Sequence, residues 1–575
     1  MGIANFFTWF KNQFPRDIMK LAKNQNFADI QVEIDNLMID MNGIIHTSAQ
    51  KIYEYGNNKP NPRLLSSRKP RRYGLKDQVR LFEDICNTVE HLIFVTNPKK
   101  RLILCVDGPA PQSKQCQQRQ RRFKAAMEKG EEDIKWQFDS NCVTPGTKFM
   151  DYLTKYVDRF IRQRISEDSR WRHLEVIFSN EKAPGEGEQK AMNYIRLHGD
   201  YEETYCIHGL DADLIMLTLS SHVRNFYILR EDLYDRSNEF FCIQMSNARD
   251  ELTEILRWQS ENFVFDPESA INDFVFLCFT VGNDFLPHIP SLEIIENGID
   301  IILDVYRDVG RYYGHITGKV DGKIQFIPES FKVFLGTISQ FEKKILEDKL
   351  NKKGVYFADL QLENCSELIE GKYVLDIERY RREYCEKHFP ADIDIRQICH
   401  EYFEGLQWVL SYYTKGVPNW KWQFSYHYAP SASILADHIS TFVLPVYGRT
   451  VPFPPYQQLL SVLPPKSANL IPAPLNRLLT DENSPIKQFC PDTFEVDLSG
   501  KRREWQGIVI LPIIDIEIMR KAYFEKIGNV DQRELKRNFT GRSYVYVYSP
   551  IPKGIFKSYY GDIQRTYVNT IAIDL

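Results

Sequence analysis

The sequence predicts an α/β protein with a mostly parallel, twisted sheet that is flanked by helices. Short apolar runs alternate with amphipathic helical patterns as far as about residue 300, an alternation typical of a parallel sheet. Acidic residues follow several of these runs directly, at the strand ends where open α/β sheets place their functional groups. Because 575 residues exceed a single hydrophobic core, we expect a first domain at 1–310 and a second, largely helical and aromatic-rich block at 311–575.

The spacing of apolar residues predicts the elements of the first domain. Residues recurring at i, i+3, i+4 and i+7 predict helices, and short apolar runs bounded by turn residues predict buried strands. The helical patterns cover residues 3–13, 79–92, 149–165 and 271–281. The strand patterns cover residues 34–41, 101–106, 174–179, 204–208 and 226–229. Strands and helices therefore alternate along most of this domain.

Acidic side chains stand where these elements end. They are Asp40, Asp107, Glu186, Glu188, Asp211, Asp213 and Asp284. In extended backbone, residues two apart point to the same side, so each closely spaced pair can face one site. A single pair is more often a helix N-cap or a solvated turn. Several carboxylates that converge repel one another unless a cation lies between them, and hard oxygen ligands favour a divalent metal.

A basic helical segment at 114–124 follows Asp107 closely. Lys114, Gln118, Arg121 and Arg122 share one helix face by the i, i+4, i+7 and i+8 rule. A charge run of this kind is usually a solvated helix. Its position beside an acidic strand end favours the alternative, a pocket in which donors on one rigid face bind a phosphate group.

A second basic run, at 51–72, lies among Pro, Ser and Asn residues. It contains Lys59, Arg63, Arg68, Lys69, Arg71 and Arg72. A solvated insertion and a nucleic-acid contact remain equally open for this run.

The second block differs from the first in its sequence pattern. Residues 331–385 are charged and helical, 397–415 form an amphipathic helix, and 444–475, rich in Pro and Leu, predict an extended connector. Rings are dense at 418–430, which usually indicates a core or a seam between domains. The alternative is that Trp420 or Trp422 stacks on a nucleobase together with His46.

Bulk composition excludes several classes of protein. Eleven cysteines are scattered singly, without a C-x-x-C motif, which argues against a zinc knuckle or a disulfide framework and for a reducing compartment. The first 17 residues lack a signal-peptide core, and no apolar run reaches membrane-spanning length. We therefore expect a soluble, cytoplasmic monomer, with a nuclear location not excluded.

Several long motifs, in order, resemble the Xrn-type 5′→3′ exoribonucleases over nearly the whole chain. The first block carries them at residues 1–3, 6–7, 35–46 (DNLMIDMNGIIH) and 282–287 (GNDFLP). The second carries them at residues 405–410 (GLQWVL), 426–430 (YHYAP), 457–465 (QQLLSVLPP) and 505–507 (WQG). The chain resembles the two-block nuclease core without the large C-terminal domains, so we expect a PIN/flap-nuclease-like catalytic domain whose pocket the second block completes.

The resemblance implies a role for each of the residues singled out above. The seven acids would bind Mg²⁺ or Mn²⁺, the four residues of the basic face would bind a 5′-monophosphate, and His46 would stack on the terminal base. A ring from the second block, Trp420 or Trp422, would be its partner. Two positions depart from the family: Gln189 replaces a usual His, and Gln112 replaces a usual basic residue. Neither is a metal ligand, so we expect activity to survive.

The expected activity is processive hydrolysis of decapped, single-stranded RNA to nucleoside 5′-monophosphates, assisted by two metal ions. Two alternatives remain. The first is a flap-type structure-specific DNA nuclease, which uses similar acid clusters. The second is a catalytically idle RNA-binding scaffold, although a disused site has no reason to retain so many repelling carboxylates.

Overall fold

The computed structural model describes residues 5–58, 74–128, 138–232, 238–352 and 357–575. The basic run at 59–72 and the motif at 1–3 lie outside these residues. Within the described part of the chain, no helix is both long enough and apolar enough to cross a membrane.

One large sheet organises the first domain, and its central strands are parallel. Among the described residues it has nine strands, whose spatial order is β1 (Ile18–Ala22), β7 (Asn238–Gln244), β6 (Phe226–Glu231), β5 (Tyr205–His208), β2 (Asn36–Asp40), β3 (Arg101–Cys105), β4 (Glu175–Ser179), β14 (Ser543–Tyr548) and β15 (Val568–Ile573). The five strands from β6 to β4 pair in parallel, whereas both edges are antiparallel. The predicted parallel sheet is thus confirmed at its centre, and the complete sheet is mixed.

Helices cover both faces of this sheet. Those of the first domain are α1 (Phe6–Gln13), α2 (Met41–Tyr53), α4 (Leu75–Thr96), α5 (Gln112–Glu128), α7 (Lys148–Glu167), α8 (Ser169–Arg172), α9 (Gly187–His198), α10 (Asp213–Ser220), α11 (Met245–Leu256), α12 (Pro267–Cys278) and α13 (Gly298–Tyr313). Successive strand residues point to opposite faces. Accordingly Leu37 and Ile39 join a core with α2, α4 and α7, while Met38 joins a core with α9, α10 and α12.

The second block is largely helical, as predicted, with short hairpins between its helices. Its helices are α14 (Pro328–Asn351), α15 (Leu360–Asn364), α16 (Ile377–His388), α17 (Ile395–Lys415), α18 (Ala432–His438), α19 (Pro455–Val462), α20 (Arg477–Thr480), α21 (Ile516–Ile527) and α22 (Gln532–Leu535). Its hairpins are β8–β9 (Thr317–Val320, Lys323–Phe326), β10–β11 (Ser366–Ile369, Lys372–Leu375) and β12–β13 (Glu495–Asp497, Ile508–Ile510). The expectation of an extended connector at 444–475 is wrong in its middle, because α19 starts with Pro455 at its first helical position, where a missing N–H costs nothing.

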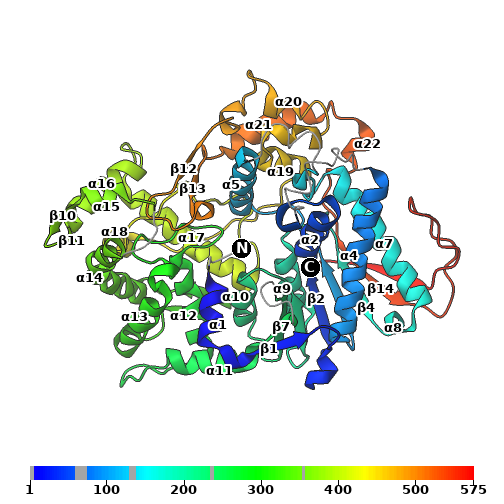
Figure 1. The fold of residues 1–575 in the computed structure, drawn as a ribbon, viewed down its shortest axis with the longest axis horizontal. Coiled ribbons are helices and arrows are strands. Elements are labelled where there is room, and N and C mark those ends of the chain that lie inside the picture. The colour runs from blue at the N-terminus through cyan, green and yellow to red at the C-terminus, as the bar shows by residue number, and fades with distance from the viewer. Residues whose placement is uncertain (1–4, 59–73, 129–137, 233–237, 353–356) are drawn as a thin grey trace.

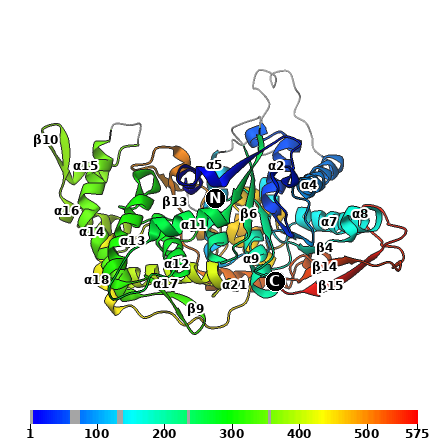
Figure 2. The same cartoon turned by 90° about the horizontal axis from the view of Figure 1, so that it is seen from below.

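The two blocks interlock rather than sitting side by side. The last hairpin, β14–β15, extends the sheet next to β4, so the second block supplies two strands to the first domain. Figures 1 and 2 show this hairpin at one side of the molecule and α13–α18 at the other. Helix α5 stands between them, beside α19 and below α20 and α21 (Figure 1). A boundary near residue 310 stays a prediction, but the sheet itself crosses it.

Candidate functional site

The candidate site lies at the carboxyl ends of the central strands, where two neighbouring strands are followed by helices on opposite faces of the sheet. Helix α2 leaves β2 toward one face, and α10 leaves the neighbouring β5 toward the other. Such a switch point leaves a crevice at the carboxyl ends of the strands. Asp40 ends β2, Asp107 follows β3, and the pairs Glu186/Glu188 and Asp211/Asp213 follow β4 and β5. Six of the seven predicted acids therefore come from four adjacent parallel strands.

Asn42 joins the first two acids. Its side-chain Nδ2 donates to Oδ2 of Asp107 at 2.8 Å, and its Oδ1 accepts the backbone N–H of Asp107 at 3.0 Å. The backbone N–H of Asn42 in turn donates to Oδ1 of Asp40, the N-cap of α2, at 3.3 Å. Sequence reasoning did not single out Asn42, although its position two residues after Asp40 was the available signal.

Gly187 allows the strands to approach this closely. Its backbone N–H donates to Oδ1 of Asp107 at 2.7 Å. A Cβ atom at this position would lie 2.6 Å from Oδ1 of Asp40 and 3.1 Å from the carbonyl oxygen of Cys105. Because such distances are well inside van der Waals contact, a larger residue here would displace an acid or the backbone.

Asp284, the seventh acid, reaches the others through Lys114. It lies in the loop after α12, where Oδ1 of Asn283 accepts the N–H groups of Phe285 and Leu286 at 2.8 and 2.9 Å. The Nζ of Lys114 lies 2.6 Å from Oδ2 of Asp284 and 2.5 Å from Oε2 of Glu186. The basic helix therefore contacts the acid cluster directly, through a lysine that was predicted to bind phosphate.

The pKa shifts show how strongly the carboxylates interact. Burial raises the pKa of Asp40 well above its usual value, and the carboxylates of Asp107 and Asp211 raise it further. Burial and Asp213 do the same for Glu188. The pKa of Asp213 rises to about 7, first through burial and then through the charge of Asp284. Glu186 also raises the pKa of Asp40, so all seven predicted acids take part in one set of mutually repelling charges.

Lys114 partly neutralises this set. Burial would raise the pKa of Asp284, but the ammonium group of Lys114 brings it below its usual value. Burial lowers the pKa of Lys114 itself, but the charges of Asp284 and Glu186 outweigh burial and raise this pKa well above the usual range. The lysine is therefore firmly charged.

The seven carboxylates suit a hard divalent cation in chemistry, although their side chains are not arranged around one common point. Among the described residues, no group of three or more His, Cys, Asp or Glu side chains is arranged so that it could hold a metal ion as it stands. Oε2 of Glu188 is buried and lacks a hydrogen-bond partner in the described part of the chain. Carboxylate oxygens are the ligands that Mg²⁺ and Mn²⁺ prefer. The residues fit such an ion in chemistry and charge.

The rest of the predicted basic face lies beside the acids. Gln118 and Arg122 are buried, and Oε1 of Gln118 and Nη1 of Arg122 have no hydrogen-bond partner among the described residues. Burial, and then the neighbouring Arg121, lowers the pKa of Arg122 to about 9. A buried guanidinium with an unused donor is suited to an anionic ligand.

His46 lies close to this face. It stands on α2, and burial followed by the charges of Arg121 and Arg122 lowers its pKa to about 4. The imidazole is therefore neutral at pH 7. A neutral ring beside two arginines is suited to stacking rather than to proton transfer.

The two candidate tryptophans differ in burial. Trp422 is 8% exposed, and its ring stacks on that of Trp408 at 5.1 Å with 24° between the planes. Trp420 is only partly buried. Burial thus favours Trp420 as the ring that remains open to a ligand.

The two departures from the family pattern have local partners. Gln189 is buried, and its Oε1 accepts a hydrogen bond from Nη2 of Arg196 at 3.2 Å. Gln112 is also buried, and its Nε2 donates to Oε1 of Gln423 at 3.3 Å. Gln189 therefore bonds within its own helix, α9, and Gln112 bonds to the loop that carries Gln423.

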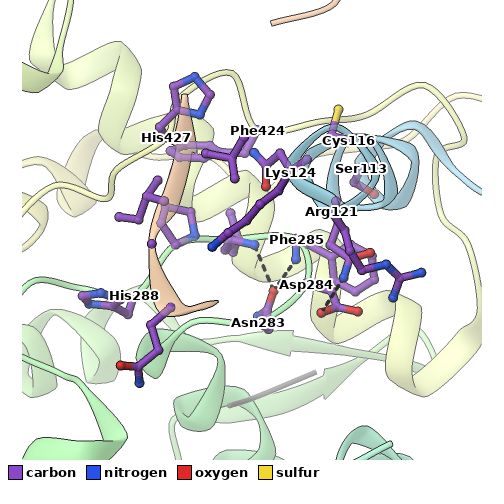
Figure 3. A pocket seen from close by; sticks show the side chains of 18 of the residues that line it. Ser113, Cys116, Arg121, Lys124, Asn283, Asp284, Phe285, His288, Phe424 and His427 are labelled. Atoms are coloured by element: carbon purple, nitrogen blue, oxygen red, sulfur yellow. Dashed lines mark hydrogen bonds between the residues drawn. The ribbon is translucent and has the colours of Figure 1, made fainter. Parts of the chain in front are cut away.

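A cavity of about 570 Å³ opens beside Asp284. Helix α5 forms one wall with Arg121 and Lys124, and the loop that carries Asn283 and Asp284 forms another. In Figure 3, Arg121 lies next to Asp284, and Lys124 extends over the same cavity. Of the seven acids, Asp284 is therefore the one that this cavity reaches.

Comparisons with known proteins identify the family of the chain. Residues 1–232 match the family described as XRN 5′-3′ exonuclease N-terminus, and residues 264–372 and 363–572 match the Xrn1 helical domain. The chain is 29% identical to 5′-3′ exoribonuclease 1 of Saccharomyces cerevisiae over 98% of its own length, and it covers 46% of that protein. It is 30% identical to the 5′-3′ exoribonuclease 2 homolog of Drosophila melanogaster over 96% of its length, covering 74% of that protein. It is 32% identical to 5′-3′ exoribonuclease 1 of Homo sapiens over 94% of its length, covering 35% of that protein.

Solved structures give weaker likenesses. The catalytic core of Rad2 in complex with DNA aligns with a TM-score of 0.31 and 13% identity, covering 60% of this chain and 76% of that chain. The T5 D15 protein crystallised with metal ions aligns with a TM-score of 0.27 and 11% identity, covering 53% and 85%. These scores are too low to support a conclusion.

Proposed function

Because the chain belongs to the XRN family of 5′-3′ exonucleases, we propose that it is a processive 5′→3′ exoribonuclease. Its substrate would be single-stranded RNA with a 5′-monophosphate, and its products nucleoside 5′-monophosphates. The observation that carries the proposal is the direct contact between the acid cluster and the basic helix, through Lys114, Glu186 and Asp284. A phosphate bound on the basic face would lie about one nucleotide from bonds that the acids can reach.

The seven acids would hold the metal. Bound Mg²⁺ or Mn²⁺, two ions in this proposal, would supply an activated water and stabilise charge on the leaving oxygen. Asn42 would orient Asp107 while its backbone orients Asp40. For Glu186 and Asp284 to serve as ligands, the ammonium group of Lys114 would leave both carboxylates and become available to the substrate phosphate.

The basic face would select the RNA end. Gln118, Arg121 and Arg122 would bind the 5′-monophosphate, joined by Lys114, and a cap or triphosphate would be too bulky for this pocket. His46 and Trp420 would stack on the first base. Stacking contributes about 1–3 kcal/mol per base and does not read sequence, which suits an enzyme that degrades many RNAs.

The setting of this activity is also a proposal. Eleven free cysteines suit a reducing compartment such as the cytoplasm, where a monomer of this kind would act in mRNA decay.

The test compares nucleotide release from 5′-monophosphorylated, 5′-hydroxyl and capped RNA, each with Mg²⁺ and with a chelator. We expect release only from the 5′-monophosphorylated RNA with Mg²⁺, and its loss in the double variant Asp211→Ala, Asp213→Ala, which should still bind RNA. Preferential cleavage of branched DNA would favour the flap-nuclease alternative. RNA binding without nucleotide release in any metal would favour the idle scaffold.

A further inference from the structure

Glu186 is held from two sides by different parts of the chain. It is 4% exposed, and its Oε2 faces the Nζ of Lys114 at 2.5 Å. Its other oxygen, Oε1, accepts a hydrogen bond from the hydroxyl group of Tyr412, which lies on α17 in the second block, 226 residues along the chain. A hydroxyl from one block and an ammonium group from the other thus fix the orientation of a single carboxylate.

The Tyr412 ring has little freedom to move. It is 1% exposed and stacks on the ring of Trp408 at 5.1 Å with 14° between the planes. Phe285 packs edge-on against it at 5.1 Å. Trp408 stacks in turn on Trp422. The three stacked rings of Tyr412, Trp408 and Trp422, here called the ring stack, fix the direction in which the hydroxyl points.

The far end of the ring stack holds the start of the basic helix. The carbonyl oxygen of Trp422 accepts the N–H of Ser113 at 3.1 Å, and that of Trp420 accepts the N–H of Gln112 at 2.9 Å. Nε1 of Trp408 donates to the carbonyl oxygen of Asn419 at 2.9 Å. The first N–H groups of a helix lack partners within it, so the carbonyl oxygens of Trp420 and Trp422 supply acceptors for α5. One packed unit therefore contacts both Glu186 and the helix that carries Lys114.

Trp422, the ring of the stack that lies outside α17, packs closely against this helix at Gly405. A Cβ atom on Gly405 would lie 2.9 Å from Cζ2 of Trp422 and 2.7 Å from Cδ2 of Leu286. Leu286 belongs to the loop that presents Asp284. The same packing therefore supports a second acid of the cluster.

We propose that Tyr412 is a positioning residue for Glu186, through which the second block aligns the acid cluster with the basic helix. The expected effect on kcat rests on the proposed nuclease function, whereas the expected effect on metal binding does not. A hydroxyl that merely satisfied a buried carboxylate would contribute to stability alone. A positioning hydroxyl also changes how the carboxylate meets a cation, because partners behind metal ligands typically alter affinity or activity by about 10–100-fold.

The experiment compares Tyr412→Phe with Tyr402→Phe. Tyr402 is a matched control, since it lies on the same helix and is 0% exposed. Its hydroxyl donates to the carbonyl oxygen of Pro287 at 3.1 Å, and the substitution removes this hydrogen bond. Mn²⁺ binding is measured without RNA by electron paramagnetic resonance, and kcat and KM are measured on 5′-monophosphorylated RNA. For Tyr412→Phe we expect roughly tenfold weaker Mn²⁺ binding and a roughly tenfold lower kcat with little change in KM. Tyr402→Phe should match the parent in all three.

Two results would overturn the proposal. One is Mn²⁺ binding by Tyr412→Phe that equals or exceeds that of the parent. The other is equal weakening by both tyrosine variants, which would indicate general destabilisation. A parent protein that binds Mn²⁺ but releases no nucleotide would instead refute the proposed function, and the Mn²⁺ comparison would still decide the role of Tyr412.

Discussion

Replacing Lys114 with methionine removes a positive charge from the middle of the acid cluster while keeping a side chain of similar length. The Lys114 side chain is 12% exposed and lies within 2.6 Å of oxygens of both Glu186 and Asp284. Removing one partner of a buried charge pair costs about 3–5 kcal/mol, because the remaining charge is left uncompensated. Without divalent cations, we therefore expect the free energy of unfolding to fall by about 3–5 kcal/mol.

Mg²⁺ should restore much of this loss, since it can neutralise the same carboxylates. Binding at 100 times the dissociation constant stabilises a folded protein by about 2.7 kcal/mol. The assay is urea unfolding of parent and variant in chelator and in saturating Mg²⁺. The control is Lys124→Met on the same helix. The Nζ of Lys124 donates to the carbonyl oxygen of Glu504 in an exposed hydrogen bond, so this change should alter stability by less than about 0.5 kcal/mol. An equal loss with and without Mg²⁺, or no loss in chelator, would refute the reasoning.

Three further predictions concern individual residues. The pKa of Asp213 is raised to about 7 in the folded protein, so this group stabilises the fold fully at pH values below its unfolded pKa and loses that effect as the pH rises through 7. In chelator, the parent should therefore gain stability relative to Asp213→Asn as the pH is lowered from 8 to 5.5. A stability difference in urea unfolding that does not change with pH would contradict this. Gly187→Ala should abolish nucleotide release, because its Cβ would meet Oδ1 of Asp40 at 2.6 Å; a variant as active as the parent would show that the acids need no such approach. Trp420→Ala should weaken RNA binding by about 1–3 kcal/mol, whereas Trp422→Ala should instead lower stability by about 3–5 kcal/mol; titration with RNA and thermal unfolding would separate the two, and the reverse pattern would contradict the assignment.

Local sequence pointed to the acids, because each lies at the end of a buried strand or helix or in the segment that follows it. Asp40 and Asp107 follow apolar runs that became β2 and β3, and the parallel order of these strands brings their ends together. The basic face was predictable for the same reason, since helical spacing alone determines which side chains share a face.

Contacts between distant segments were not predictable in this way. Tyr412 is one of many rings on an amphipathic helix, and no local pattern indicates that its hydroxyl meets Glu186. Nor does the sequence distinguish Trp420 from Trp422, which differ in burial in the folded chain. Similarly, nothing in residues 543–573 indicates that they pair with β4 rather than form a separate hairpin. The sequence predicted only a phosphate-binding role for Lys114, because its acidic partners Glu186 and Asp284 lie 72 and 170 positions further along the chain.

The central claim is that seven carboxylates from distant segments form a single site for divalent cations beside the basic helix. Anomalous diffraction from crystals soaked in Mn²⁺ tests it most directly. The account predicts anomalous density among Asp40, Asp107, Glu186, Glu188, Asp211, Asp213 and Asp284, with the ammonium group of Lys114 no longer paired to Glu186 and Asp284. Mn²⁺ density confined to other parts of the protein, with Lys114 still paired to both acids, would contradict it.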